Sequence, residues 1–405
     1  MEMSINECLI ATPALSSPAA ARVLLDELTS RLDQVKQESP SPEKLAQDYY
    51  LPMFEAAVTL QRFSQADALR QEIVEENIPD CELPRWWSLN FELDFCQQRF
   101  GEAEEWCQRG MIQLEDGTNE NGSAIVFHQL GMIAQNRHDL DAAEQWYRMA
   151  LEAATRAGND SAASITYHQL GMLALEQHDL VAAEEWYDKS LCIKESDGNG
   201  LGLVLTCHQL GIVAQQEWDL EAAESWYNRA RQLSEESGFD RGAANAYHQL
   251  GRIAMERDQF DDAESWYKKA LDITEREGDE HGTCCIYNQL GTMAEEREDA
   301  AGAETWYRQA LESGERRGDL QMEALSCGQL GSLAGMQNKF EDCGNWLVRS
   351  ILIFVKSEDS RNAAHMAESF LHHFRQAPMK EQDKLRAVWH TVGLGRLSDG
   401  AEDTD

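Results

Sequence analysis

Residues 164–203 read SITYHQLGMLALEQHDLVAAEEWYDKSLCIKESDGNGLGL, and the spacing of apolar residues in this stretch decides the fold. The first half carries aromatic, apolar and small residues at intervals of three and four: Tyr167, Leu170, Gly171 and Ala174. That spacing places the four residues on one face of an α-helix, which we expect to run from about 162 to about 177. A helix with one apolar face has to bury it against another element.

The second half of the stretch predicts a second helix, from about 180 to about 196. Its small and aromatic residues again follow helical spacing: Ala183, Tyr187 and Ser190. Asp179 stands directly before this helix, where its carboxylate can accept a hydrogen bond from a free backbone N–H and cap the helix. Gly198 follows the helix, where glycine adopts the left-handed conformation that ends many helices. The stretch therefore predicts a pair of helices.

The helix pair recurs along the chain with a constant period of 40 residues. Tryptophan marks this period: Trp106, Trp146, Trp186, Trp226, Trp266, Trp306 and Trp346. The tetrapeptide His-Gln-Leu-Gly begins at His128, His168, His208 and His248, and related tetrapeptides begin at Asn288 and Gly328. Because one pair cannot bury its own apolar faces, we expect successive pairs to stack into a solenoid in which each repeat contacts its neighbours.

The pattern Tyr167-x2-Leu170-Gly171-x2-Ala174, followed by Ala183-x3-Tyr187, resembles the tetratricopeptide repeat in order and spacing. This resemblance implies an all-α fold, a right-handed superhelical solenoid of about seven to eight helix pairs with terminal capping helices. The period of 40 residues differs from the family's usual period of about 34, and the usual closing proline is absent. In its period the chain is similar to the longer-repeat branch found in Pins, kinesin light chains and bacterial signalling and defence proteins.

The repeats define the expected domain boundaries. We expect an N-terminal helix and linker over 1–43, with the helix at about 19–37 and the linker at about 39–42. A repeat array follows over 44–358, made of a degenerate unit, a divergent unit, five regular units and a last unit: 44–83, 84–123, 124–323 and 324–358. Capping helices are expected over 359–396, at about 362–374 and about 379–392, and an acidic disordered tail over 397–405.

The chain is strongly acidic, with a formal net charge of −37 from 72 Asp and Glu against 35 Lys and Arg. This balance argues against nucleic acid and against an anionic membrane surface as partners, because both require a basic face. Two explanations of the charge stay open: solubility by self-repulsion, or steering of a basic partner. Neither a secretory signal nor an apolar run long enough to span a membrane occurs, so we expect a cytoplasmic protein.

The sequence offers no motif for catalysis. It contains none of the patterns GxxxxGK[ST], HExxH, GxSxG or CxxC, and its ten cysteines are scattered. We therefore expect no cofactor, no metal and no enzymatic activity. Three hypotheses about function stay open: an adaptor or scaffold, a regulatory or sensor subunit of a separately encoded effector such as a protease or NTPase, and an enzyme whose site lies in the divergent ends.

The recurring residues are expected to be mainly structural. The glycine of each Leu-Gly pair indicates a neighbouring helix too close for a side chain, and the Tyr beside each Trp should face its own first helix. We interpret the Trp series as core rather than as a stacking ladder for nucleic acid, which needs a basic groove. The repeated histidines stand about 8–10 Å apart on packed helices, too far to share a zinc ion. They are explained either by hydrogen bonds between repeats or by contact with a partner.

By the same resemblance, the first helices line a concave groove that binds proteins. The groove residues are then Ile125, His128, Gln129, Met132, Ile165, His168, Gln169, Met172, Leu205, His208, Gln209, Ile212, His248 and Arg252. Their apolar and His-Gln character suits an apolar or amphipathic protein or peptide partner, basic if the acidic field steers it. We also expect these histidines, close to many carboxylates, to protonate in the physiological range. The oligomeric state stays open.

Overall fold

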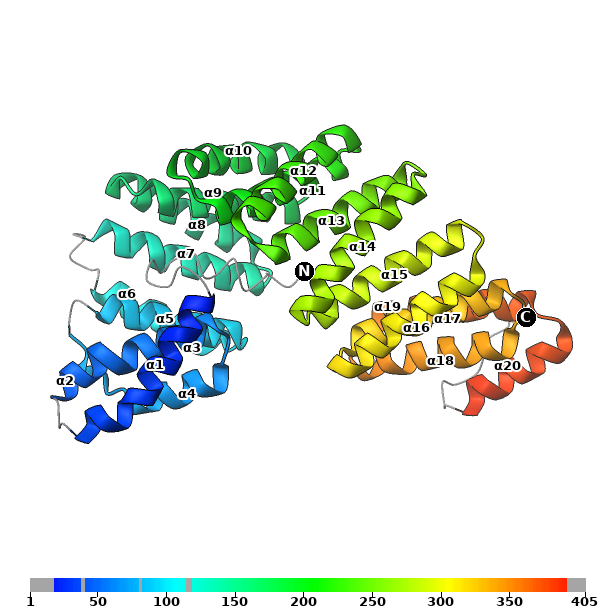
Figure 1. Cartoon of the computed structure of the whole chain (residues 1–405), viewed down its shortest axis with the longest axis horizontal. Helices are drawn as coiled ribbons and strands as arrows, with labels where there is room; N and C mark the ends of the chain where they lie inside the picture. The colour runs from blue at the N-terminus through cyan, green and yellow to red at the C-terminus, as the bar shows by residue number, and fades with distance from the viewer. Residues whose placement is uncertain (1–17, 38–40, 80–81, 114–118, 392–405) are drawn as a thin grey trace, which may run out of the picture. The chain divides into compact units, whose positions relative to one another are not determined.

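The computed structural model describes residues 18–37, 41–79, 82–113 and 119–391 of the chain (Figure 1). Every regular element within these ranges is helical, and none of the described residues forms a strand. The chain divides into two compact units between Glu217 and Trp218. The all-α fold predicted from the sequence is therefore confirmed, whereas the expected tail over 397–405 lies outside the described residues.

Unit 1 begins with a degenerate repeat covered by an N-terminal helix. Its elements are α1 (Pro18–Gln37), α2 (Pro42–Leu45), a π-helical turn (Ala46–Tyr50), α3 (Leu51–Thr59), α4 (Phe63–Glu72) and a 3₁₀ turn (Glu75–Asn77). Pro42, which we expected to end the linker, begins α2 instead. Leu25 of α1 packs with Phe54 of α3 in one buried cluster. Ala66 and Leu69 are also buried, which fits the second helix of a repeat.

The rest of unit 1 follows the 40-residue register. Its helices are α5 (Leu83–Cys96), α6 (Phe100–Gln113), α7 (Glu120–Asn136), α8 (Leu140–Ala157), α9 (Asp160–Glu176), α10 (Leu180–Asp197) and α11 (Gly200–Gln216). The bounds of α9 and α10 agree with the expected helices to within two residues. In Figure 1 these helices lie side by side in chain order, as expected for stacked pairs.

Unit 2 continues the alternation to the end of the described chain. Its helices are α12 (Leu220–Ser237), α13 (Asp240–Glu256), α14 (Phe260–Glu277), α15 (Glu280–Glu296), α16 (Ala300–Arg317), α17 (Leu320–Met336), α18 (Phe340–Lys356), α19 (Ser360–Gln376) and α20 (Met379–Thr391). Leu385 and Trp389 of α20 are buried in a cluster with Leu347 and Phe370, so α20 covers α18 and α19. The two predicted C-terminal helices are thus confirmed.

Local capping chemistry fixes where these helices begin and end. The Asp179 carboxylate accepts a hydrogen bond from the backbone N–H of Ala182 at 3.1 Å, as predicted for the N-cap of α10. Gly198 ends α10 with φ of 67°, in the left-handed region that glycine adopts without steric cost. The same glycine position ends α8, α12, α14 and α16. Short-range sequence therefore sets the 40-residue unit.

Packing inside each repeat depends on a glycine opposite a tyrosine. A Cβ atom on Gly171 would lie 2.7 Å from Cε1 of Tyr187, and the equivalent contacts in three other repeats would measure 2.4–2.6 Å. The tyrosines of these repeats are fully buried: Tyr147, Tyr187, Tyr267 and Tyr307. Both predictions, a helix too close for a side chain at the glycine and a tyrosine facing its own first helix, are confirmed.

The repeated tryptophans are half-buried at the edge of this core. The indole of Trp186 stacks on Tyr167 of its own first helix, with ring centroids 5.7 Å apart and planes 23° apart. The Lys189 ammonium lies 4.0 Å from the Trp186 ring centroid. The indoles of Trp146, Trp266 and Trp306 stack on an aromatic ring in the same way, and at Trp186 a cation holds the indole as well.

No helix among the described residues has both the length and the apolar character needed to cross a membrane. The domain boundaries expected from the sequence stay a prediction.

We predict that Gly171→Ala destabilises the protein by about 1–3 kcal/mol, because the added methyl group overlaps the Tyr187 ring. Gly200→Ala is the matched control, since a Cβ at Gly200 meets no atom within 4 Å. Chemical denaturation followed by circular dichroism measures both free energies of unfolding. Equal stability of the two variants would show that the ring moves aside without cost.

Candidate functional site

The expected groove residues do not all reach solvent. Ile125 is exposed by 37%, whereas Gln129, Met132, His168 and Gln169 are only 1–6% exposed. The others are half-buried: His128, Ile165, Met172, Leu205, His208, Gln209, Ile212, His248 and Arg252. Gln129, His168 and Gln169 are therefore too enclosed to contact a partner from a groove, and the groove assignment of the other residues stays a prediction. Met132 is also enclosed, because neighbouring first helices pack closely enough to cover it.

The histidines instead join neighbouring repeats. Nδ1 of His168 lies 3.2 Å from the Thr206 hydroxyl of α11, and Nδ1 of His128 lies 3.5 Å from the Thr166 hydroxyl of α9. In unit 2 the Asn288 amide occupies the same place and donates to the Ser326 hydroxyl at 3.3 Å. The hydrogen-bonding explanation thus holds for these positions, with a hydroxyl as the partner.

Burial keeps these histidines neutral. Loss of hydration lowers the pKa of His128 and of His208 to about 4. It also places the pKa of His168 well below its ordinary value, and the nearby Lys194 ammonium lowers it further. The expectation that they protonate in the physiological range is therefore wrong, because desolvation outweighs the acidic surface.

A hollow of about 180 Å³ opens between α5, α6 and α7, and two expected groove residues line it: Ile125 and Gln129. Further walls come from Trp87 of α5, Trp106 of α6 and Val126 of α7. The side-chain amide N–H of Gln129 donates to the Ser88 hydroxyl at 3.1 Å, and the amide oxygen of Gln129 accepts from the Cys107 thiol at 3.8 Å. The hollow is thus mainly apolar, with the polar atoms of Gln129 already satisfied.

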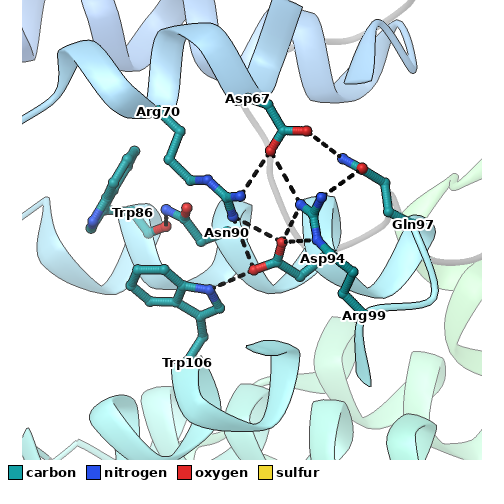
Figure 2. Close-up of polar contacts among 8 residues, drawn as sticks. All are labelled: Asp67, Arg70, Trp86, Asn90, Asp94, Gln97, Arg99 and Trp106. Carbon is teal, nitrogen blue, oxygen red and sulfur yellow. Dashed lines mark hydrogen bonds and ion pairs between the residues drawn. The ribbon is translucent and has the colours of Figure 1, made fainter. Parts of the chain in front are cut away.

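A buried ion network fixes the orientation of Trp106 in this wall. Figure 2 shows the Trp106 indole N–H directed at the Asp94 carboxylate, to which it donates at 2.8 Å. Asp94 is 1% exposed and is paired with Arg70, at 2.8 Å, and with Arg99. The two guanidinium groups offset the charge of a carboxylate that is removed from water.

A second carboxylate extends the same network. Asp67 of α4 accepts from Arg70 at 2.8 Å and from Arg99 at 3.2 Å, and the Gln97 amide donates to it at 3.1 Å (Figure 2). These bonds hold the pKa of Asp67 below its ordinary value, although partial burial opposes them. The network therefore joins α4 and α5 to the indole of α6, and it makes one wall of the hollow rigid.

Comparison with known proteins identifies the repeats. The family model described as tetratricopeptide repeat matches residues 122–196, 203–276 and 242–316. The chain contains tetratricopeptide repeats between residues 122 and 316. Comparison with the curated proteins finds no match. The assignment of these tetratricopeptide repeats to the longer-repeat branch stays a prediction.

Solved structures share the fold of this tetratricopeptide-repeat chain at low identity. The apo form of RapI is 13% identical with a TM-score of 0.58, covering 81% of this chain and 97% of RapI. The apo quorum sensor NprR from B. thuringiensis is 11% identical with a TM-score of 0.57, and the match covers 86% of this chain and 99% of NprR. A Rap protein complexed with competence and sporulation factor is 14% identical with a TM-score of 0.53, covering 91% and 100%.

Sequence reasoning missed Trp87, Trp106 and Asp94 as parts of a site. The signal lay in the divergent unit expected at 84–123, where Asn90 and Asp94 occupy positions that the regular repeats fill with leucine and alanine. Asn90, Glu92 and Asp94 are all at most 3% exposed. Polar groups at buried positions require specific partners, which marks the repeat as specialised.

We predict that Asp94→Asn lowers the free energy of unfolding by about 2–4 kcal/mol, because Arg70 and Arg99 lose their shared buried counter-charge. Glu144→Gln is the control, since its ion pair with Arg148 is exposed and such pairs contribute less than about 1 kcal/mol. Denaturation monitored by tryptophan fluorescence compares them. A similar decrease in the free energy of unfolding of both variants would contradict the structural role of the network.

The histidine environments lead to a prediction about pH. In the unfolded chain these imidazoles bind protons near pH 6.5, but in the folded chain only near pH 4. Between these two pH values the unfolded state therefore binds more protons than the folded state. The free energy of unfolding consequently falls as the pH is lowered from about 6.5 to about 4. Imidazole NMR resonances of His128 and His208 should stay unchanged from pH 8 to about pH 5. A titration midpoint near 6.5 for either residue would be incompatible with its burial.

Proposed function

We propose that this tetratricopeptide-repeat chain is a non-catalytic adaptor or scaffold that binds a partner protein or peptide. The binding surface is the face of α7, α9 and α11 that carries Ile125, Ile165 and Leu205, together with the hollow between α5, α6 and α7. An apolar side chain of the partner occupies the hollow. We propose no cofactor and no metal for this activity, and we keep the cytoplasm as its compartment.

The hollow is the single observation that carries the proposal. A hollow of about 180 Å³ with mainly apolar walls is a place where a partner's side chain leaves water without opening the core. Ile125 adds exposed apolar surface at its edge, with 37% of the residue in solvent. Since Asp94 holds Trp106 in place, one wall needs little rearrangement on binding, which lowers the entropic cost of association.

The charge of the chain favours a basic segment next to the apolar anchor. A net charge of −37 attracts positively charged partners over several ångströms and accelerates their encounter. The partner that fits both features is an amphipathic helix or extended peptide with an apolar anchor and Lys or Arg beside it. Binding should therefore weaken as the salt concentration rises.

A second function, regulation of a separately encoded effector enzyme, is supported by the proteins of similar fold. NprR is described as a quorum sensor, and a Rap protein forms a complex with competence and sporulation factor. Co-purification separates the two possibilities. A scaffold holds two partners at once, whereas a regulator changes the activity of one partner.

We predict that Ile125→Asp weakens binding of the partner by at least about tenfold, because the site loses an apolar side chain worth about 1.5–3 kcal/mol and gains a charge. The partner is first identified by pull-down with mass spectrometry, and its Kd is then measured by titration.

Val181→Asp on α10 is the matched control. Val181 is 65% exposed on a second helix, and the variant adds the same charge. Both variants should melt like the unmodified protein. An unchanged Kd for Ile125→Asp would move the binding site away from the hollow.

A further inference from the structure

Three side chains of unit 2 form a chain of contacts that the proposed function does not use. Sγ of Cys285 lies 3.9 Å from Nε2 of His281, one turn earlier on α15. Nδ1 of the same imidazole lies 3.1 Å from Oδ2 of Asp319, the residue that precedes α17. A thiol, an imidazole and a carboxylate in this order form the arrangement that activates a sulfur nucleophile.

The carboxylate is held rigidly, so it can orient the imidazole. Oδ1 of Asp319 accepts a hydrogen bond from the backbone N–H of Met322 at 3.1 Å and thereby caps α17. The other carboxylate oxygen, Oδ2, faces Nδ1 of His281. These bonds, with the charge of Arg317 3.9 Å away, keep the pKa of Asp319 below its ordinary value. An ionised Asp319 accepts a hydrogen bond from Nδ1–H, so that Nε2 faces the thiol.

The imidazole is suited to stabilise a thiolate at the Cys285 sulfur. Its contact with Cys285, and then its bond to Asp319, raise the pKa of His281 to about 9. Other charges near the group are Arg316 and Glu280, which pair with each other at 3.0 Å. A cationic imidazole beside the sulfur stabilises the negative charge of a thiolate.

The site is open to small molecules, unlike most cysteines of the chain. The His281 side chain is 47% exposed and Cys285 is half-buried. By contrast, the neighbouring Cys284 thiol is buried and bonded to the Ala310 carbonyl at 3.2 Å, and burial raises its pKa to about 11. Burial also raises the pKa of the Cys327 and Cys343 thiols, to about 12.

We propose that Cys285 is a modification site of this protein, a nucleophilic thiol that undergoes exchange with low-molecular-weight disulfides. His281, as the imidazolium, stabilises the thiolate and later supplies the proton to the leaving group, and Asp319 is a positioning residue.

The exchange balances in atoms and electrons. The Cys285 thiolate attacks one sulfur of the disulfide RSSR, a protein–S–S–R bond forms, and the S–S bond of the reagent breaks. The departing RS⁻ carries the electron pair and takes the proton from the His281 imidazolium to give RSH. Cys285 is oxidised to the mixed disulfide, and half of the reagent is reduced to the thiol.

Cys285 occupies the place in its repeat that Ile125, Ile165 and Leu205 occupy in theirs. A group attached there therefore projects from the same side of a first helix as the proposed binding residues. The proposal about thiol chemistry does not depend on partner binding, and its test needs no partner.

The experiment treats the full-length protein with dithiodipyridine, a small neutral disulfide, under pseudo-first-order conditions. Peptide mapping by mass spectrometry assigns a rate to each cysteine. Cys192 is the internal control, because it is exposed on α10 and has no imidazole contact in the described structure. Cys285 should react at least about tenfold faster than Cys192 at pH 7. Equal rates would overturn the proposal even without any variant.

Two variants test the roles of the partner residues. His281→Gln should slow the reaction of Cys285 with the disulfide by about tenfold or more at pH 7. Asp319→Asn preserves helix capping and should slow the reaction of Cys285 with the disulfide less than His281→Gln does. Circular dichroism confirms that the variants fold. A Cys285 rate that is insensitive to His281→Gln would show that the imidazole has no part in the chemistry.

Discussion

The contact between a glycine on the first helix and a tyrosine on the second, described in four regular repeats, is the constraint on which the array depends. Gly171 lets the Tyr187 ring lie where a methyl group would overlap it, so the two helices approach more closely than other residues allow. A glycine inside a helix costs about 1 kcal/mol relative to alanine. Complete burial of the tyrosine ring more than offsets this cost, which explains why the pair recurs every 40 residues.

The divergent repeat solves the same packing problem differently. Phe91 stands where the regular repeats have glycine, and Asp94 stands where they have alanine. Here the ion network around Asp94 helps to hold α4, α5 and α6 together. Such a network is a costly way to build a core, because each charge loses its hydration. What it adds is a fixed orientation for Trp106, which forms one wall of the hollow between α5, α6 and α7.

Features set by neighbours in the sequence could be predicted, and features set by stacking could not. Asp179 and Gly198 act within one turn of their own positions, so the cap and the end of α10 followed directly from the sequence. The burial of His168 and Met132 depends on the distance to the next first helix, which no spacing within one repeat reveals. The hollow depends on three helices at once. The contact of His281 with Asp319 joins residues 38 positions apart, across two repeats.

Because the Gly–Tyr contact lies wholly inside one repeat, each helix pair carries its own means of folding. The outward-facing residues of the first helices are then free of that task. They change from Ile125, Ile165 and Leu205 to Asn245 and Cys285 while the 40-residue register stays intact. Duplication of a single unit would therefore lengthen the array and supply a fresh surface for natural selection to alter, without disturbing the packing of the units already present.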